Sequence, residues 1–249
     1  MLDLKYQDKV AVLKLDRGVT NAINLEVINK LAKVLKALKT DTNVHALVLS
    51  STNDKFFSIG FDIPQLYYLS KEDFKLFYER FNERCMELYT FPKPTVAAIT
   101  GHAIAGGFIL ALCCDYRIIG KGRKLMGLNE IKLGVPVPYL ADCVLQSLVG
   151  IRNSREIVES GEFYHSEESL QMGMVDQVLP LEDVLLKSIE KAQSIGSIPQ
   201  DTYRIIKRNR VEVTESQIGT HWKEKQRSFI ECWYSKETRE LLREAMKKF

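Results

Sequence analysis

The sequence predicts an α/β fold, and two observations along its 249 residues support this prediction. Short apolar segments rich in valine and isoleucine, typical of strands, alternate with segments of helical periodicity up to about residue 194. From about residue 195 the strand pattern disappears, and charged segments of helical periodicity follow. We therefore expect an α/β core over residues 1–194 and a helical region over residues 195–249.

The predicted elements begin with a strand and an amphipathic helix. Residues 9–15, KVAVLKL, alternate as a half-buried strand does, and the turn DRGVTNA follows. Asn24 is a good N-cap for the segment LEVINKLAKVLKALK. Apolar residues recur along this helix at helical spacing, with lysines opposite them: Ile28, Leu31, Leu35 and Leu38.

Further strands and helices follow in order. Three more strands are expected, over residues 45–51, 95–101 and 116–120. FFSIGFDI, at 56–63, is a strand-and-loop unit after the first of these, and HAIAGGFILALCCD, at 102–115, follows the second. The helical region is expected to hold helices over residues 201–210, 220–233 and 236–249.

Composition argues against several classes of protein. A net charge of +3, without any aromatic-and-basic motif, gives no reason to expect a nucleic-acid partner. The five cysteines form neither a CxxC pair nor a regular framework, and the histidines are scattered, so we expect reduced thiols and no metal site. The N-terminus is charged, and no run approaches the roughly 20 apolar residues of a membrane span. The expectation is a soluble, cytoplasmic protein without a membrane partner.

Two adjacent glycines, Gly106 and Gly107, open an apolar stretch of helix length. The residues after Gly106 are not the lysine and Ser/Thr of a phosphate-binding loop. Two interpretations remain: close packing of helix on strand, or approach of a substrate to the free N–H groups of a helix start. Gly60 precedes a second expected helix start at Phe61, so two backbone amides would be available to hold one oxyanion.

The order of these motifs resembles the enoyl-CoA hydratase/isomerase, or crotonase, superfamily. The resemblance rests on VAVLKLDRGVTNAIN, FFSIGFDI, PKPTVAAITGHAIAGGFILALCCDYRI, LNEIKLGV and SLQMGMVDQVLP, which match in order and spacing over most of the chain. It implies a spiral of ββα turns. It also implies that the C-terminal helices cover the active site and pack between subunits of a homotrimer or a dimer of trimers.

The resemblance also implies where an acyl-CoA substrate binds. The backbone N–H groups of Phe61 and Gly106 would hold the thioester oxygen, and coenzyme A would enter only as part of that substrate. Further substrate-binding positions are implied along the first turn, at both glycine turns and on the central helix: Asn21, Ala22, Gly60, Asp62, Ile63, Gly107 and Ile109. The adenine would lie near residues 61–63.

The reaction is inferred from which carboxylates are present. Hydratases of the family use two glutamates, and here the first position is Ile109, whereas the second is Glu130. One carboxylate is enough to move a proton from C2 to C4, so the pattern is similar to that of the 3,2-enoyl-CoA isomerases. We expect Glu130, near Ile109 and Met126, to have a pKa raised by desolvation. Two alternatives stay open: another crotonase-type activity, such as a weak hydratase, hydrolase or decarboxylase, and a non-catalytic acyl-CoA-binding subunit.

Several charged residues outside the motifs have two interpretations each. His102 is expected to pack, and Asp115 is expected to end a helix or to pair structurally. A basic run near residue 207 would meet the 3′-phosphate of coenzyme A or form a solvated helix face. That run consists of Arg204, Lys207, Arg208 and Arg210.

Overall fold

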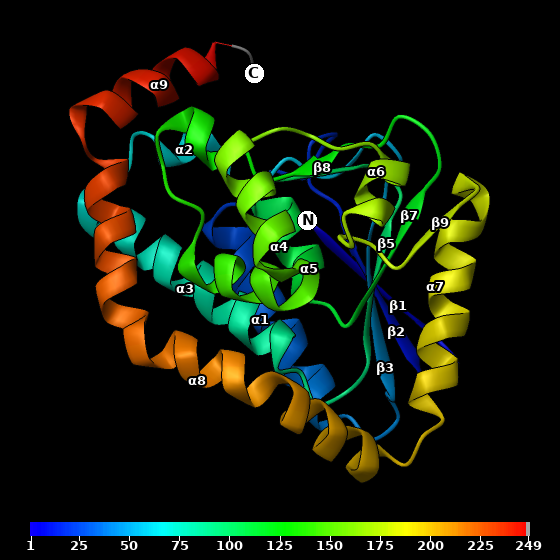
Figure 1. The fold of residues 1–249 in the computed structure, drawn as a ribbon. Helices are drawn as coiled ribbons and strands as arrows, with labels where there is room; N and C mark the ends of the chain where they lie inside the picture. The colour runs from blue at the N-terminus through cyan, green and yellow to red at the C-terminus, as the bar shows by residue number, and fades with distance from the viewer. Residues whose placement is uncertain (248–249) are drawn as a thin grey trace.

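The computed structural model describes residues 1–247, which form two sheets with helices around them (Figure 1). The larger sheet has the strand order β1-β2-β3-β5-β7-β9, and only its β1–β2 pair is antiparallel. Its strands are β1 (Leu2–Gln7), β2 (Val10–Leu15), β3 (Ala46–Ser51), β5 (Thr95–Ile99), β7 (Tyr116–Gly120) and β9 (Gln177–Leu179). The smaller, parallel sheet has the strands β4 (Phe56–Ser58), β6 (His102–Ile104) and β8 (Met126–Gly127).

The two sheets are built from successive ββα turns. Each of the pairs β3–β4, β5–β6 and β7–β8 gives one strand to the larger sheet and the next to the smaller one, and helices follow each pair. These helices are α2 (Ile63–Leu66) and α3 (Lys71–Tyr89), then α4 (Gly106–Leu112), then the 3₁₀ helix η1 (Glu130–Leu133) and α5 (Tyr139–Ser160). The expected spiral of ββα turns is confirmed.

The larger sheet is buried on both faces because its alternating side chains enter two different clusters. Val10 and Val12 of β2 pack in a cluster with Val184 of α7 (Leu181–Gly196), which lies along one face of the sheet in Figure 1. Ala11 and Leu13 point the other way, into the main core with α1 (Leu25–Thr40) and α3. Burial on both faces accounts for the apolar runs of the parallel strands.

The C-terminal region differs from the expectation in its number of helices and its starting residue. The helices predicted over 201–210 and 220–233 are one helix, α8 (Gln200–Trp233), and α9 (Lys236–Met246) follows. The predicted boundary at residue 195 falls in the last turn of α7, which still packs on the larger sheet. The helical region therefore begins after Gly196.

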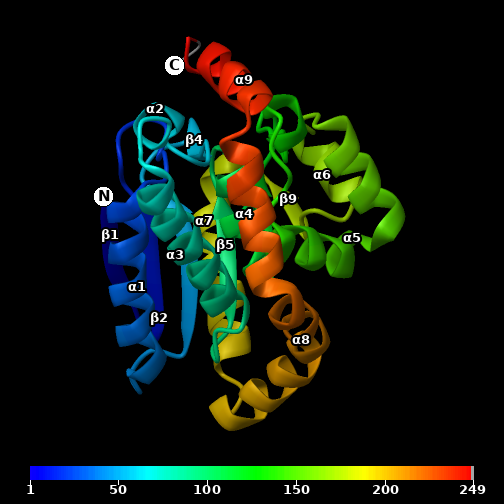
Figure 2. The ribbon, with the colours of Figure 1, turned by 90° about the vertical axis from the view of Figure 1, so that its left-hand side faces the viewer.

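The C-terminal helices pack into the main core of the same chain. α8 runs alongside α3 in Figure 2, and its Phe229 and Trp233 are buried in the main core. The first half of α8 leaves three apolar side chains exposed: Ile205, Ile206 and Val213. The packing of this region between subunits stays a prediction. No helix within residues 1–247 is both long enough and apolar enough to cross a membrane.

Candidate active site

The two glycine turns lie against each other. Gly60 follows β4 with a φ of 92°, and a Cβ built there would lie 2.8 Å from the backbone nitrogen of Gly106. A Cβ at Gly106 would in turn lie 3.1 Å from Cδ1 of Phe61. Only glycine permits this approach at position 60. Any other residue would be strained at this positive φ, and its Cβ would clash with a backbone atom. The start of α4 is therefore next to the Gly60–Phe61 peptide.

Both backbone amides implied in substrate binding are free. The N–H groups of Phe61 and Gly106 have no hydrogen-bond partner within residues 1–247. Gly106 begins α4 after Ala105, whose backbone has a φ of 48° and a ψ of −123°, and the helix starts without a side-chain cap because alanine has no side-chain acceptor. Free N–H groups at such a start favour an oxygen that gains negative charge.

A cavity of about 520 Å³ adjoins these amides. Phe61, Ile63 and Gly106, which the sequence predicted, line it together with Glu130. Its wall is otherwise mainly aliphatic and aromatic, and comes from both halves of the chain: Ile59, Ile104, Leu133, Val135, Pro138, Phe163, Phe229, Trp233 and Leu241. A mostly apolar cavity with a few polar groups is typical of a small-molecule site.

Glu130 brings a carboxyl group into this apolar surrounding. It is the first residue of η1, three residues after the end of β8, and only 6% of its surface is exposed. Its Oε2 has no hydrogen-bond partner among the described residues. Burial raises the pKa of Glu130 to about 7, although its own backbone N–H partly offsets this effect. The group therefore titrates near neutral pH, as a general acid/base should.

Three predicted substrate contacts instead hold the first turn in place. The Asn21 amide donates to Ser51 Oγ at 3.0 Å and to the Phe57 carbonyl at 3.2 Å, so it is not free for a ligand. Asp62 caps α2 and forms an ion pair with Arg17, 2.6 Å long. The carbonyl of the third, Ala22, accepts from the same Arg17 guanidinium at 2.9 Å. The Asn21 side-chain amide is therefore not available to a ligand, and the binding of coenzyme A along this turn, near Asn21 and Ala22, stays a prediction.

Packing explains the second glycine of the central pair. A Cβ at Gly107 would lie 2.2 Å from the carbonyl oxygen of Ser58 in β4, so the residue allows α4 to sit on that strand. The expectation that substrate fills this space is wrong, since protein backbone occupies it. Ile109, on the next turn, is fully buried and is not among the residues that line the cavity.

The family model described as enoyl-CoA hydratase/isomerase matches residues 5–249. The chain belongs to this family. It is 30% identical to the human mitochondrial enoyl-CoA delta isomerase 1 over 85% of this chain and 70% of that protein. It is 33% identical to a probable enoyl-CoA hydratase of Bacillus subtilis over 70% of this chain and 67% of that protein.

A solved structure agrees with the whole fold. The crystal structure of human mitochondrial delta3-delta2-enoyl-CoA isomerase superposes with a TM-score of 0.95 and 26% identity, covering 99% of this chain and 97% of that one. The protein is therefore an acyl-CoA-processing enzyme of the enoyl-CoA hydratase/isomerase family.

Within this family member, the basic run of α8 serves the fold. Lys207 is 2% exposed and donates to Asp115 Oδ2 at 2.9 Å, Arg210 pairs with the other carboxylate oxygen, and Tyr203 also donates to Asp115. Arg204 and Arg208 pair with acids of the same helix. The expectation that this run meets the 3′-phosphate of coenzyme A is wrong for Lys207, because its ammonium group is buried against the Asp115 carboxylate. The structural role expected for Asp115 is confirmed.

His102 packs as expected. Its Nδ1 accepts the backbone N–H of Leu125 at 2.9 Å, and its ring meets Phe56 edge-on at 5.2 Å. Burial and the nearby cations Lys124 and Arg123 lower the pKa of His102, so the ring stays neutral at pH 7.

The C-terminal helices of the same chain cover the cavity. Leu241, Glu244 and Ala245 of α9 line it, together with Phe229 and Trp233 of α8. In Figure 2, α9 lies at the end of the molecule, next to α2. Sequence reasoning assigned a cover to this region but named none of these residues, because apolar side chains on a helix do not reveal which neighbour they face.

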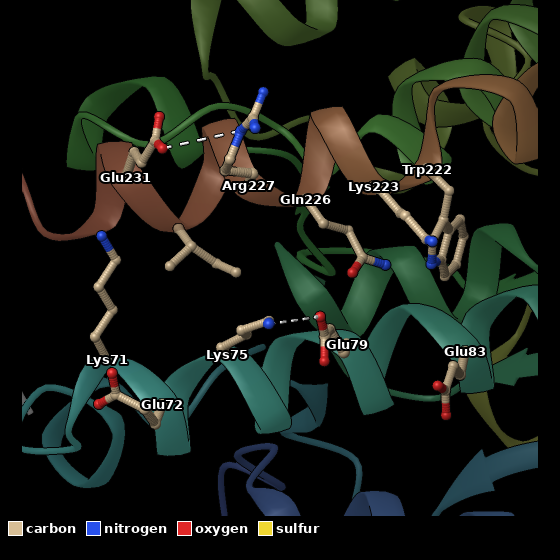
Figure 3. Close-up of a pocket in the computed structure, with 11 residues that line it drawn as sticks. Lys71, Glu72, Lys75, Glu79, Glu83, Trp222, Lys223, Gln226, Arg227 and Glu231 are labelled. Atoms are coloured by element: carbon tan, nitrogen blue, oxygen red, sulfur yellow. Dashed lines mark ion pairs between the residues drawn. The ribbon is translucent and has the colours of Figure 1, made fainter.

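A second cavity, of about 790 Å³, lies between α3 and α8 (Figure 3). Its walls carry charges of both signs, including the ion pairs Lys75–Glu79 at 3.8 Å and Arg227–Glu231 at 4.0 Å. Gln226 points from α8 towards α3. Phe61, Gly106 and Glu130 do not line this cavity, whereas all three line the smaller, apolar one.

Proposed function

We propose that the protein isomerises 3-enoyl-CoA to 2-trans-enoyl-CoA, with Glu130 as its single general acid/base. The observation that carries this proposal is a buried carboxyl of raised pKa in the same cavity as Phe61 and Gly106. Position 109, where the family's hydratases have their other glutamate, is isoleucine. The names of the human and mouse relatives, which are enoyl-CoA delta isomerases, support the same reaction.

The residues account for each step of this reaction. The thioester oxygen would accept hydrogen bonds from the backbone N–H groups of Phe61 and Gly106, and these donors would stabilise the enolate as it forms. The ionised Glu130 would take a proton from C2, the double bond would move, and the same carboxyl would return the proton to C4. The reaction needs no added water, which suits an apolar cavity.

The cofactor requirement, the oligomeric state and the location of the protein also belong to the proposal. Coenzyme A enters as part of the substrate, and the residues described here require no separate cofactor. We also propose a homotrimer or a dimer of trimers, in which the exposed apolar side chains of α8 contribute to the interface. We also propose a cytoplasmic location, on the same argument from the sequence that the five cysteines form neither a CxxC pair nor a regular framework.

Assays with two substrates separate the proposed activity from its alternatives. The purified protein should convert 3-hexenoyl-CoA to the 2-enoyl product and should add water to crotonyl-CoA far more slowly. Hydration as fast as isomerisation would favour a hydratase, the activity named for the Bacillus subtilis relative. Tight binding of acyl-CoA without any turnover would favour the other alternative, a non-catalytic acyl-CoA-binding subunit.

The reaction rate should rise with pH through about 7. Burial holds the pKa of Glu130 near that value, and only the ionised form can take the C2 proton. The acid limb of kcat/KM for 3-hexenoyl-CoA should therefore have its midpoint close to pH 7. A midpoint near 4.3, the pKa of an ordinary glutamate, would show that Glu130 is not the group that titrates.

Replacing Gly60 with alanine should slow the reaction more than it weakens binding. The added methyl would lie 2.8 Å from the Gly106 nitrogen, so one of the two amides must move away from the thioester oxygen. Loss of one such donor typically lowers kcat by about 10²-fold. Gly18→Ala is the matched control, because it also has a positive φ but has open space around its Cβ. Equal kcat values for the two variants would contradict a role for position 60 in the site.

A further inference from the structure

Asn129 lies directly before Glu130 and lines the same cavity. It occupies the N-cap position of η1, but its side chain does not cap that helix. The side-chain amide is half-buried and makes no hydrogen bond to any of residues 1–247. A donor and an acceptor of this partly exposed residue are thus left without a protein partner at the edge of an apolar cavity.

Glu130 lacks a hydrogen-bond donor, and the Asn129 side-chain amide is one without a partner. Its Oε2 is buried without a donor, whereas the other charged groups of the cavity wall have partners. Lys132 pairs with Glu162, and Glu244 pairs with Lys247, each at 2.6 Å. The neighbouring Asn129 amide is thus a donor that those ion pairs do not engage.

Two further groups near the cavity do not fill this role. The indole N–H of Trp233 also lacks a partner, but its ring stacks on Phe74 at 4.3 Å within the aromatic cluster of α3. Burial raises the pKa of the Tyr78 hydroxyl on α3, so this group keeps its proton and can donate, but Tyr78 is not among the residues that line the cavity. Asn129 differs from both because it adjoins Glu130 in the chain.

We propose that Asn129 is a positioning residue, whose side-chain amide donates to Glu130 Oε2 when an acyl-CoA fills the cavity and displaces water. The two groups are not bonded in this structure, so the proposal requires the Asn129 side chain to turn towards Oε2 within the cavity that both residues line. The bond would hold one carboxylate oxygen so that the other could serve C2 and C4 in turn. A neutral amide cannot activate water as a second carboxylate would. The proposal rests on the proposed function, since it assumes that Glu130 is the base.

The test compares the pH profiles of kcat for 3-hexenoyl-CoA among variants, because kcat reports the ionisation of Glu130 in the substrate complex, where the bond is proposed to form. Asn129→Ala removes the amide, and Asn129→Asp keeps its shape while removing the N–H donor. A donated hydrogen bond stabilises the ionised carboxyl, so its loss should move the acid limb up by about one pH unit, or about 1.4 kcal/mol. The shift should be larger for Asn129→Asp, because a second negative charge also disfavours ionisation of Glu130. At pH 6 the alanine variant should be about tenfold slower.

Control variants distinguish failure of the positioning role of Asn129 from failure of the proposed function. Asn29→Ala, at an exposed position on α1, should leave the profile unchanged. If Glu130→Gln is inactive while both Asn129 variants keep the wild-type limb, the positioning role is wrong and the proposed function stands. A rate loss in the Asn129 variants that is equal at every pH would likewise overturn the role, because it would indicate structural damage only. Full activity of Glu130→Gln would instead overturn the proposed function itself.

Discussion

Glu130→Gln should lower the rate of isomerisation of 3-hexenoyl-CoA by about 10³-fold, within the range typical of lost general acid–base catalysis. Glutamine has nearly the same shape, so the cavity should keep its form, but an amide cannot take a proton from C2. Substrate binding should change little, because the proposed thioester contacts come from the backbone of Phe61 and Gly106. Single-turnover rates and the Kd of a non-reactive acyl-CoA would separate the two effects.

The control for this variant is Glu244→Gln, on α9. Glu244 lines the same cavity, but it is exposed and paired with Lys247, so its loss should leave the rate within a few-fold of wild type. If the two variants retain equal activity, Glu130 is not the base.

The stability of Glu130→Gln gives an independent check on the buried carboxyl. The folded pKa of Glu130 is raised to about 7, so the native state keeps this proton while the unfolded chain loses it, and the contribution of Glu130 to stability falls as pH rises from about 4 to 7. Glutamine carries no charge and avoids this loss. The variant should therefore be at least as stable as wild type at pH 8, as thermal unfolding would show. Lower stability at pH 8 would mean that the carboxylate is solvated.

The central strands of the larger sheet, β2, β3, β5 and β7, could be predicted from sequence because they are largely buried on both faces. Residues 45–51, 95–101 and 116–120 were expected as strands and contain β3, β5 and β7. The smaller sheet was largely missed because β6 and β8 have only three and two residues, too few to show a period. Strand β1 was also missed, since its charged residues were considered only as evidence against a signal peptide.

The candidate site was predictable where backbone geometry imposes a motif, and not elsewhere. Gly60 and Gly106 are needed for the approach of two helix starts, so they mark the site in the sequence. The cavity walls from α8 and α9 have no such mark, since an apolar residue there serves the core equally well. For Lys207 the sequence left open a phosphate contact or a solvated helix face, and the structure shows neither, because its carboxylate partner, Asp115, lies 92 residues away in the chain.

Asp115→Ala should lower the free energy of unfolding by about 3–5 kcal/mol, because it leaves a buried cation without a partner. Asp115 accepts from Lys207, Arg210, Tyr203 and Thr95, and joins the start of α8 to β5 and β7. Lys207 is 2% exposed and cannot turn to water without moving the helix. Thermal unfolding should show a midpoint lower by on the order of 10 °C.

Two comparisons distinguish this cause from a general effect of removing charge. Asp201→Ala breaks an exposed pair with Arg204 on the same helix and should cost about 1 kcal/mol or less. Burial alone would raise the pKa of Asp115, but Lys207 and Arg210 outweigh it and hold the pKa below its usual range. Its contribution is therefore present above pH 4 and lost as pH falls through the folded pKa, so the gap between wild type and Asp115→Ala should narrow in acid. A gap that stays constant down to the acid-unfolding region would show that the variant acts through packing and not through the ionised carboxylate.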